Sequence, residues 1–353
     1  LKPTTDVDPV VEAARGKIPY DSITIVRSIG MGALKTVSEA IIDDQRYAYI
    51  EFHTILSRDH IDREAKPVEE AEKELIIMRH LQGHPNIVRL HGEVYFAPQH
   101  RACGKDTAGF VLELCDGSLT NWLETCKSVT LAQKRSVALQ LIRAVTFMHA
   151  KGVIHRDLKP GNVLLDSFEN PTVKVIDFGL AVRSEQTQEC SEVGSEHFIA
   201  PEQFGRLDSD TYETLTPLVD VWSMGCVLLF LFTGQLPFNS VRVTSYVLVR
   251  GELPPEISLL AEDVKPLVSM CLVWSSAHRP TAAAVLEYAE RTLGVQTPPP
   301  GEAGTQKQPS EAKVDASQVD YRRVIRHEEL GVGSFKRVWR AQVDGGPSVA
   351  FVE

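Results

Sequence analysis

The chain has 353 residues, of which 43 % are hydrophobic and 24 % are charged, and this balance excludes a disordered or fibrous protein. Such a length allows about two domains of roughly 150 residues each. The formal net charge of −10 argues against non-specific binding to nucleic acid or to anionic membranes. Six cysteines without C-x-x-C spacing indicate reduced thiols rather than a disulfide framework or a zinc site, so we expect a cytoplasmic protein.

The spacing of apolar residues predicts the secondary structure along the chain. Residues 1–19 carry few large apolar side chains and are expected to form a linker. The patterns then indicate strands over 20–96 around one helical stretch at 68–81, helices over 118–150, short strands at 163–165 and 173–177, and mostly helices after 216. The apolar run 221–232 is well short of the ~20 residues that span a bilayer, so we expect a buried helix there. A small β-rich lobe therefore precedes a larger helical lobe.

Part of the chain occurs twice. The segment YDSITIVRSIGMGALKTVSEA at 20–40 aligns with YRRVIRHEELGVGSFKRVWRA at 321–341, and YAYIE at 47–51 aligns with VAFVE at 349–353. A period of about 300 residues is too long for a solenoid repeat and indicates tandem domains.

These alignments define the expected domain organisation. One complete unit covers 20–293, and the truncated start of a second unit covers 321–353. The intervening segment 294–320 has four prolines and no aromatic residue, which is typical of a flexible linker. Both ends of the chain are expected to be cuts in a longer polypeptide. Because the strands of 321–353 lack a lobe to pack against, we predict that this segment is disordered or loosely attached.

Four short motifs follow one another in the second half of the complete unit. HRDLKPGN begins at His155, DFG at Asp177, APE at Ala200 and DVWSMG at Asp220. Each means little alone, but in this order and spacing they resemble the eukaryotic protein kinase family over about 20–293. The resemblance implies an α+β bilobal fold with a five-stranded antiparallel sheet and one helix, then a larger helical lobe. ATP and Mg²⁺ would bind between the two lobes.

The resemblance also implies which residues carry the chemistry. In phosphoryl transfer the protein mainly positions the reacting groups and neutralises the charge of the phosphates. Asp157 would orient the substrate hydroxyl and accept its proton, and Lys159 would reach the γ-phosphate. Asn162 and Asp177 offer the hard oxygen ligands that suit Mg²⁺. In this family a lysine two residues after the catalytic aspartate goes with serine/threonine specificity, so protein substrates with Ser or Thr are expected.

The run GMGALKTV resembles the glycine-rich loop of the family, with Gly30 and Gly32 where backbone N–H groups approach phosphates closely. Its third glycine position holds Lys35, and the place of the phosphate-binding lysine on the next strand holds Ile50. Two interpretations remain open. Either the chain has lost the lysine and is a nucleotide-binding pseudokinase that regulates its tandem neighbour, or the charge has moved to Lys35.

Strand alternation favours relocation of the charge. Lys35 lies two residues before Val37, and position 50 lies two residues after Ala48. In this family Val37 and Ala48 would both face the adenine, so Lys35 and position 50 face the same cleft from neighbouring strands about 4.8 Å apart.

The partial repeat carries the same exchange, with Lys336 in its loop and Val352 at the vacant position. Random decay is not expected to produce the same replacement twice, and the exchange resembles that of the with-no-lysine kinases. The stretch ELIIMRHL resembles the helix that supplies an ion-pair glutamate, and Glu74 within it is expected to meet Lys35.

Register with the family places the remaining residues of the nucleotide site. Adenine would meet Leu112 as the gatekeeper, the backbone of Glu113 and Cys115, and the side chains of Val37, Ala48 and Leu164.

Regulatory and structural roles follow from the same register. Arg156 is expected to bind a phosphate on the activation loop, because a guanidinium binds phosphate bidentately. Ser191 is the first choice of phosphorylation site, and Ser195 takes the place of the residue that contacts the catalytic aspartate. Structural roles are expected for His155 beneath Phe178, for Asp220 against the catalytic-loop backbone, and for Arg279 paired with Glu202.

Overall fold

The computed structural model describes residues 16–31, 35–52, 65–95, 107–185, 190–191, 193–204, 214–239, 252–294, 324–333, 336–343 and 349–352. It divides into two units, Leu1–Gln296 and Thr297–Glu353. The division lies within the predicted linker 294–320. Most of that linker, and residues 1–15 of the predicted N-terminal linker, lie outside the described residues.

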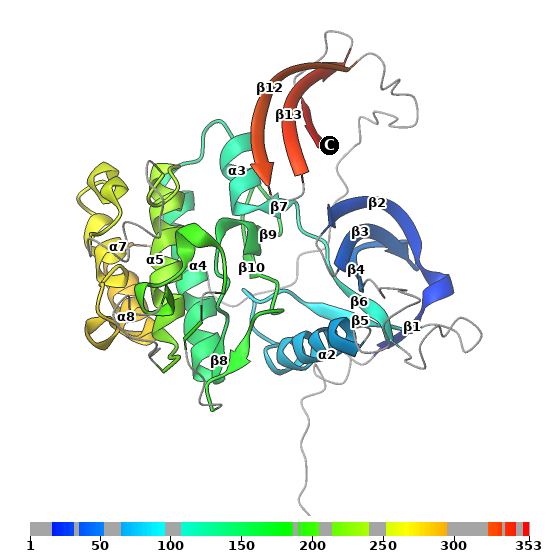
Figure 1. Ribbon diagram of the computed structural model, residues 1–353, viewed down its shortest axis with the longest axis horizontal. Helices are drawn as coiled ribbons and strands as arrows, with labels where there is room; N and C mark the ends of the chain where they lie inside the picture. The colour runs from blue at the N-terminus through cyan, green and yellow to red at the C-terminus, as the bar shows by residue number, and fades with distance from the viewer. Residues whose placement is uncertain are drawn as a thin grey trace, which may run out of the picture. The chain divides into compact units, whose positions relative to one another are not determined.

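The first unit begins with a six-stranded sheet of strand order β1-β5-β6-β4-β3-β2 (Figure 1). Its strands are β1 (Gly16–Pro19), β2 (Thr24–Met31), β3 (Lys35–Ile42), β4 (Gln45–Phe52), β5 (Leu90–Tyr95) and β6 (Thr107–Glu113). A two-residue turn joins β3 to β4, and its Asp43 and Asp44 have φ of +48° and +61°. Two successive positive φ values match the right-handed twist of a tight hairpin, and aspartate tolerates them.

The sheet has one strand more than predicted. β1 pairs in parallel with β5, with Gly16 opposite Gly92 and Pro19 opposite Tyr95. The expectations of five antiparallel strands and of a linker reaching residue 19 are therefore wrong. The physical reason is a small apolar core on one face of the sheet, made of Ala40, Ile42, Tyr49, Val94 and Val111, with Ile18, Ile23 and Tyr47 packed against it.

Helix α2 (Ala65–His80) belongs to the same lobe. Leu75, Met78 and Leu81, at or just after its end, recur at helical spacing and are all buried, so the helix predicted at 68–81 is confirmed. After it, the Ile87 backbone forms a parallel bridge to Val175 in the second lobe. This bridge joins the segment that follows α2 to the second lobe.

The second lobe is mostly helical (Figure 1). Its helices are α3 (Leu119–Thr125), α4 (Leu131–Ala150), α5 (Leu218–Thr233), α7 (Lys265–Cys271) and α8 (Ala282–Thr292). Short strands among them are β7 (Gly117–Ser118), β8 (Val153–Ile154), β9 (Val163–Leu165), β10 (Val173–Val175) and β11 (Val182–Arg183). The 3-10 helices of the unit are η1 (Tyr20–Ser22), η4 (Pro160–Asn162), η5 (Glu196–Phe198), η6 (Pro201–Phe204), η7 (Pro255–Leu259) and η8 (Ser276–His278). A β-sheet lobe followed by a helical lobe confirms the predicted α+β bilobal fold.

Local sequence explains where these helices begin and end. Ser118 and Thr130 cap α3 and α4 through capping boxes with Asn121 and Gln133, which satisfy backbone donors that lack partners inside the helix. Gly234 ends α5 with φ of +74°, a conformation that glycine adopts without strain. No helix among the described residues is long and apolar enough to span a membrane.

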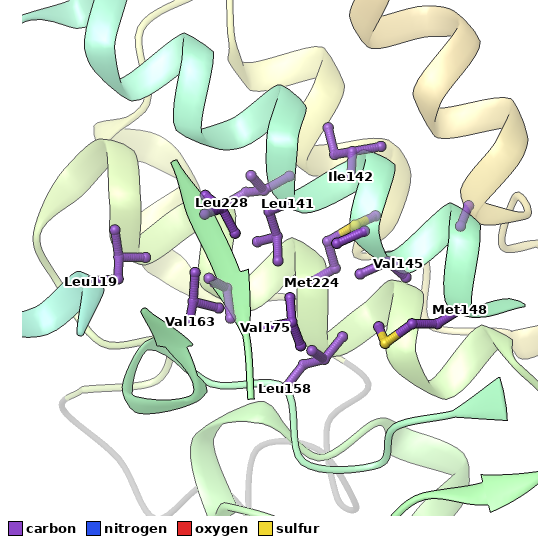
Figure 2. Close-up of a cluster of buried hydrophobic side chains, with 14 of the residues drawn as sticks. Leu119, Leu141, Ile142, Val145, Met148, Leu158, Val163, Val175, Met224 and Leu228 are labelled. Carbon is purple, nitrogen blue, oxygen red and sulfur yellow. The ribbon is translucent and has the colours of Figure 1, made fainter. Parts of the chain in front are cut away.

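The core of this lobe lies between α4 and α5 (Figure 2). α5 buries nearly its whole circumference, as predicted for the apolar run 221–232. Figure 2 shows side chains of α4 and α5 together with those of the short strands, of α3 and of the loop between β8 and β9: Leu141, Ile142, Val145, Met148, Met224, Leu228, Val163, Val175, Leu119 and Leu158. A rigid core therefore lies directly beneath the loops that connect these short strands.

The second unit contains a three-stranded antiparallel sheet of order β12-β13-β14. The strands are β12 (Val324–Gly333), β13 (Lys336–Val343) and β14 (Val349–Val352). The described residues of 321–353 form paired strands, and the loose attachment of this segment to the first unit stays a prediction. The register places Val338 opposite Val352, as Val37 stands opposite Ile50 in the first unit.

Candidate active site

The loop between β8 and β9 gathers polar groups around one carboxylate. Asp157 is buried, and its Oδ2 accepts hydrogen bonds from Lys159 Nζ at 2.7 Å and Asn162 Nδ2 at 2.9 Å. Its Oδ1 accepts one from Ser195 Oγ at 3.0 Å. Three donors on two oxygens leave the carboxylate little rotational freedom, so its position is well defined.

A second buried carboxylate holds this loop in place. Oxygens of Asp220, the residue at the start of α5, accept the backbone N–H groups of His155 at 2.8 Å and Arg156 at 2.9 Å. His149 Nε2 lies 2.9 Å from the same carboxylate. Burial raises the pKa of Asp220, but the hydrogen bonds and charges of the histidines outweigh it, so the pKa lies below its ordinary value. Asp220 thus remains ionised and fixes Arg156 at a φ of +65°.

His155 has the packing position predicted for it. Its ring lies 5.2 Å from the ring of Phe178, centroid to centroid, and its Nε2 is 2.9 Å from the carbonyl oxygen of Ile176. Both His155 and Phe178 are fully buried. Phe178 therefore points into the core, and Asp177, whose φ is +65°, turns the opposite way toward the first lobe.

Asp177 meets Lys35 and Glu74 there. Lys35 Nζ donates to both carboxylate oxygens of Glu74, at 2.9 and 3.0 Å, and to Asp177 Oδ1 at 2.7 Å. These residues come from β3, from α2 and from the segment after β10. The Glu74 side chain is only 4 % exposed, whereas that of Asp177 is 33 % exposed, so the cluster is open on the Asp177 side.

The electrostatics of this cluster keep the lysine charged. Burial alone would lower the pKa of Lys35, but the attraction of Glu74 and Asp177 is stronger and raises it above its ordinary value. Burial would likewise raise the pKa of Asp177, but the combined effects of Lys35, His155 and Lys159 outweigh it and leave this pKa below its ordinary value. Lys35 is therefore an ammonium group and Asp177 a carboxylate at neutral pH.

Strand register explains how Lys35 reaches this place. Val37 stands opposite Ile50 and Lys35 opposite Phe52 in the β3–β4 pair. Residues that are directly opposite in an antiparallel pair share a face, and alternation puts Lys35 and Val37 on that same face. Ile50 is buried in the main apolar core, so position 50 contributes packing and Lys35 contributes the charge.

The predicted adenine-binding residues lie around the same face. Ala48 stands opposite Leu112 in the β4–β6 pair, and both are buried. Val37 and Leu164 are half-buried.

Glu113 and Cys115 lie in the segment that joins the two lobes, here called the hinge, and their surroundings were not predicted from register. The side chain of Glu113 pairs with Lys174 Nζ at 3.0 Å and accepts the Arg89 N–H at 2.7 Å, which ties the hinge to both lobes. Burial raises the pKa of the Cys115 thiol to about 12, so this cysteine stays protonated and is a poor nucleophile. The role expected of both residues, hydrogen bonding to adenine, uses their backbone groups and not these side chains.

The glycine loop is described in part. Gly30 lies in β2 opposite Val37, and a Cβ at Gly30 would be 3.6 Å from Val37 Cβ, an ordinary contact. Packing against the described residues therefore does not require glycine at position 30. Gly32 lies outside the described residues.

Asn162 and Asp177 suit the Mg²⁺ that the sequence predicts. The amide nitrogen of Asn162 donates to Asp157 O at 2.8 Å and to Asp157 Oδ2 at 2.9 Å. The amide oxygen of Asn162 is therefore the atom that could bind a metal ion. Asp177 is ionised. Two hard oxygen donors match a cation that takes its remaining ligands from phosphates and water. Among the described residues, no group of three or more His, Cys, Asp or Glu side chains is arranged to hold a metal ion by itself.

The predicted regulatory residues lie on the catalytic loop (Arg156) and on the activation segment between Asp177 and Ala200 (Ser191 and Ser195). Ser195 contacts Asp157, as described above. Ser191 is half-buried, and its carbonyl oxygen accepts the Val193 N–H at 2.8 Å. Arg156 Nε donates to the carbonyl oxygen of Leu180 at 2.7 Å, which connects the catalytic loop to the start of the activation segment. Elsewhere, Arg279 pairs with Glu202 through two bonds of 2.7 and 3.0 Å, as expected of a structural pair.

Comparison with known proteins gives consistent matches. A family model for the protein kinase domain matches residues 23–289. Mitogen-activated protein kinase kinase kinase 3 of Arabidopsis thaliana is 30 % identical over 264 residues, which cover 74 % of this chain and 44 % of that protein. Calcium-dependent protein kinase 29 of the same plant is 32 % identical over 63 % of this chain and 40 % of its own length. Sperm motility kinase Z of Mus musculus is 32 % identical over 64 % of this chain and 42 % of its own length. The chain thus matches less than half the length of these curated relatives.

Proposed function

Because the chain belongs to the protein kinase family, we propose that its first unit transfers the γ-phosphate of ATP to serine and threonine hydroxyls of protein substrates. The observation that carries this proposal is the Lys35–Glu74–Asp177 cluster, with distances of 2.7 to 3.0 Å. A chain that had lost the family's phosphate-binding lysine without replacement would leave Glu74 buried without a cation, at a large desolvation cost. Lys35 supplies that cation.

The proposed mechanism uses the geometry of the catalytic loop. Asp157 orients the substrate hydroxyl and accepts its proton as the oxygen bonds to the γ-phosphorus and the bond to the β-phosphate oxygen breaks. Lys159, held against Asp157 at 2.7 Å, lies beside the transferred group and stabilises its charge. Asn162 and Asp177 would hold Mg²⁺, which neutralises phosphate charge when bound.

The adenine would be bound by the residues on the cleft face. In this proposal Val37, Ala48 and Leu164 enclose the ring, and Gly30 and Gly32 bring the backbone to the phosphates. The backbone of Glu113 and Cys115 supplies hydrogen bonds. Support comes from the shared face of β3 and β4 and from the Ala48–Leu112 register.

Three finer assignments belong to the same proposal. Position 50, where the family has its phosphate-binding lysine, is an isoleucine, and Lys35 takes over the charge. This exchange is of the kind found in with-no-lysine kinases. Residues 321–353 begin a second kinase domain, which the register of Val338 opposite Val352 supports. Ser191 is a phosphorylation site whose phosphate pairs with Arg156, a group that already connects the catalytic loop to the activation segment.

Ile50 favours a second candidate function, that of a nucleotide-binding pseudokinase. Its buried apolar side chain occupies the place of the family's lysine. The two functions are separated by incubating the purified chain with radiolabelled ATP, Mg²⁺ and a general Ser/Thr substrate protein. We expect label in serine and threonine, and none above background from Asp157→Asn. Equal labelling by the wild type and by Asp157→Asn would contradict the proposed kinase activity. A shift of the melting temperature by ATP would then support the pseudokinase.

A further inference from the structure

Gln203 is a buried amide that none of the steps above uses. It lies in η6, directly after Glu202, and is 1 % exposed. Its Nε2 donates to the carbonyl oxygens of Ser191 at 3.4 Å and Val193 at 3.3 Å, and its Oε1 accepts the Ala200 N–H at 3.1 Å. Its own N–H donates to Ala200 O at 3.0 Å. One side chain therefore connects three points of the backbone between 191 and 200.

The backbone held in this way carries a residue of the catalytic site. Between Val193 and Ser195 the chain turns at Gly194, whose φ is +115° and where an added Cβ would lie 2.7 Å from Arg156 O. The activation segment thus passes directly against the catalytic loop. One residue later, Ser195 Oγ donates to Asp157 Oδ1. The position of this donor depends on the turn at Gly194, and that turn follows immediately after the carbonyls that Gln203 holds.

We infer that Gln203 is a positioning residue: it holds the segment 191–200 so that Ser195 stays on the catalytic aspartate. The expected effect on catalysis rests on the proposed kinase function, whereas the expected effect on the backbone of 191–200 does not. Loss of both amide donors would release the Ser191 and Val193 carbonyls from a buried partner, and the turn would no longer be fixed. Asp157 would then lose one of the three donors that orient it.

The contacts also bear on regulation. Gln203 is neutral and acts on backbone carbonyls, so it holds the segment in the unphosphorylated chain. A phosphate on Ser191 would add a pairing with Arg156 to a segment that is already in place. Phosphorylation is therefore expected to adjust activity rather than to create it.

Two variants separate the shape of Gln203 from its hydrogen bonds. Gln203→Met has a similar volume and makes none of the three side-chain bonds. Gln203→Glu, studied near pH 8, keeps the shape and an acceptor for Ala200 but has no donor for the two carbonyls. The matched control is Gln140→Met, because Gln140 also bonds several polar groups, Ser136 Oγ, Pro171 O and the Val173 N–H among them, and none of these belongs to the activation segment.

The first measurement is amide hydrogen exchange in the full chain, which needs no catalytic activity. Both Gln203 variants should raise exchange of the peptide covering 190–200 by about tenfold or more. Gln140→Met should lower the melting temperature without this local change. Unchanged exchange at 190–200 in Gln203→Met would overturn the inference, even if the chain transferred no phosphate.

The second measurement is steady-state kinetics. A misplaced catalytic group costs on the order of 10² in rate, so both Gln203 variants should lose about that factor in kcat for the protein substrate. KM for ATP should stay within about threefold of wild type, because nucleotide binding uses other residues. Wild-type kcat in Gln203→Glu would reject the role of the two donor bonds. If the wild-type chain is inactive, the proposed function fails, and the exchange measurement alone decides on Gln203.

Discussion

Lys35 is the residue on which the proposed relocation of the charge depends. Substitution by methionine keeps an unbranched side chain, one atom shorter, but removes the ammonium from Glu74 and Asp177. Loss of one preorganised electrostatic contact typically costs ~10²–10³ in kcat, and we expect a decrease in this range for Lys35→Met. Phosphate transfer at varied ATP concentration measures it. A kcat/KM for ATP within a few-fold of wild type would show that Lys35 does not act on the nucleotide.

The reciprocal variant tests whether the charge has moved between strands. Lys35→Gly combined with Ile50→Lys should recover part of the activity lost in Lys35→Met, because position 50 faces the same cleft and can reach Glu74. Recovery should be incomplete, since the packing around Ile50 was not formed for an ammonium stem. The single variant Ile50→Lys, with two competing lysines, serves as the control. Activity of the double variant no higher than that of Lys35→Gly would contradict the exchange.

At the scale of elements, the loop after α2 gives a pH-dependent stability. The ring of His84 stacks on Phe147 with centroids 4.6 Å apart, and its Nδ1 accepts the Asn86 N–H at 3.2 Å. Burial, with smaller effects of the Arg143 and Lys174 charges, lowers its pKa. The folded state therefore favours neutral His84, whereas the unfolded chain takes up a proton near pH 6.5. The free energy of unfolding should decrease as pH falls below about 6.5 and level off below the folded-state pKa.

His84→Gln should reduce the slope of this pH dependence in urea unfolding between about pH 7 and pH 5. His278→Gln, at an exposed histidine, provides the matched control for the replacement of histidine by glutamine. The same slope in His84→Gln as in the wild type would show that other groups control stability in this range.

The elements also show which parts of the fold could be predicted from sequence. The motifs around Asp157 and Asp177 predicted the catalytic loop because these residue types recur at fixed spacing, and alternation predicted that Lys35 and Ile50 share a face. β1 was missed because four residues pairing with β5, over seventy positions away, leave no local periodicity. Gln203 was missed for a similar reason: a buried amide that holds backbone atoms has no pattern in sequence.

At the scale of the whole molecule, the first unit has apolar cores of its own, which draw on residues from Ile18 to Leu293. Removing Thr297–Glu353 should therefore leave the melting temperature of the first unit unchanged to within about 3 °C, which corresponds to roughly 1 kcal/mol for a domain of this size. Differential scanning calorimetry of the shortened chain measures this. A larger decrease would mean that the second unit stabilises the first.

The position of Lys35 on the hairpin of β2 and β3 also links two movements. A lysine at position 50 would lie on β4, which has a neighbouring strand on each side. Lys35 instead begins β3, whose neighbour β2 is the edge strand of the sheet. If the proposed kinase lifts this hairpin to admit ATP or release ADP, the ammonium group moves away from Glu74 as well. Nucleotide exchange and the release of helix α2 would then be a single motion.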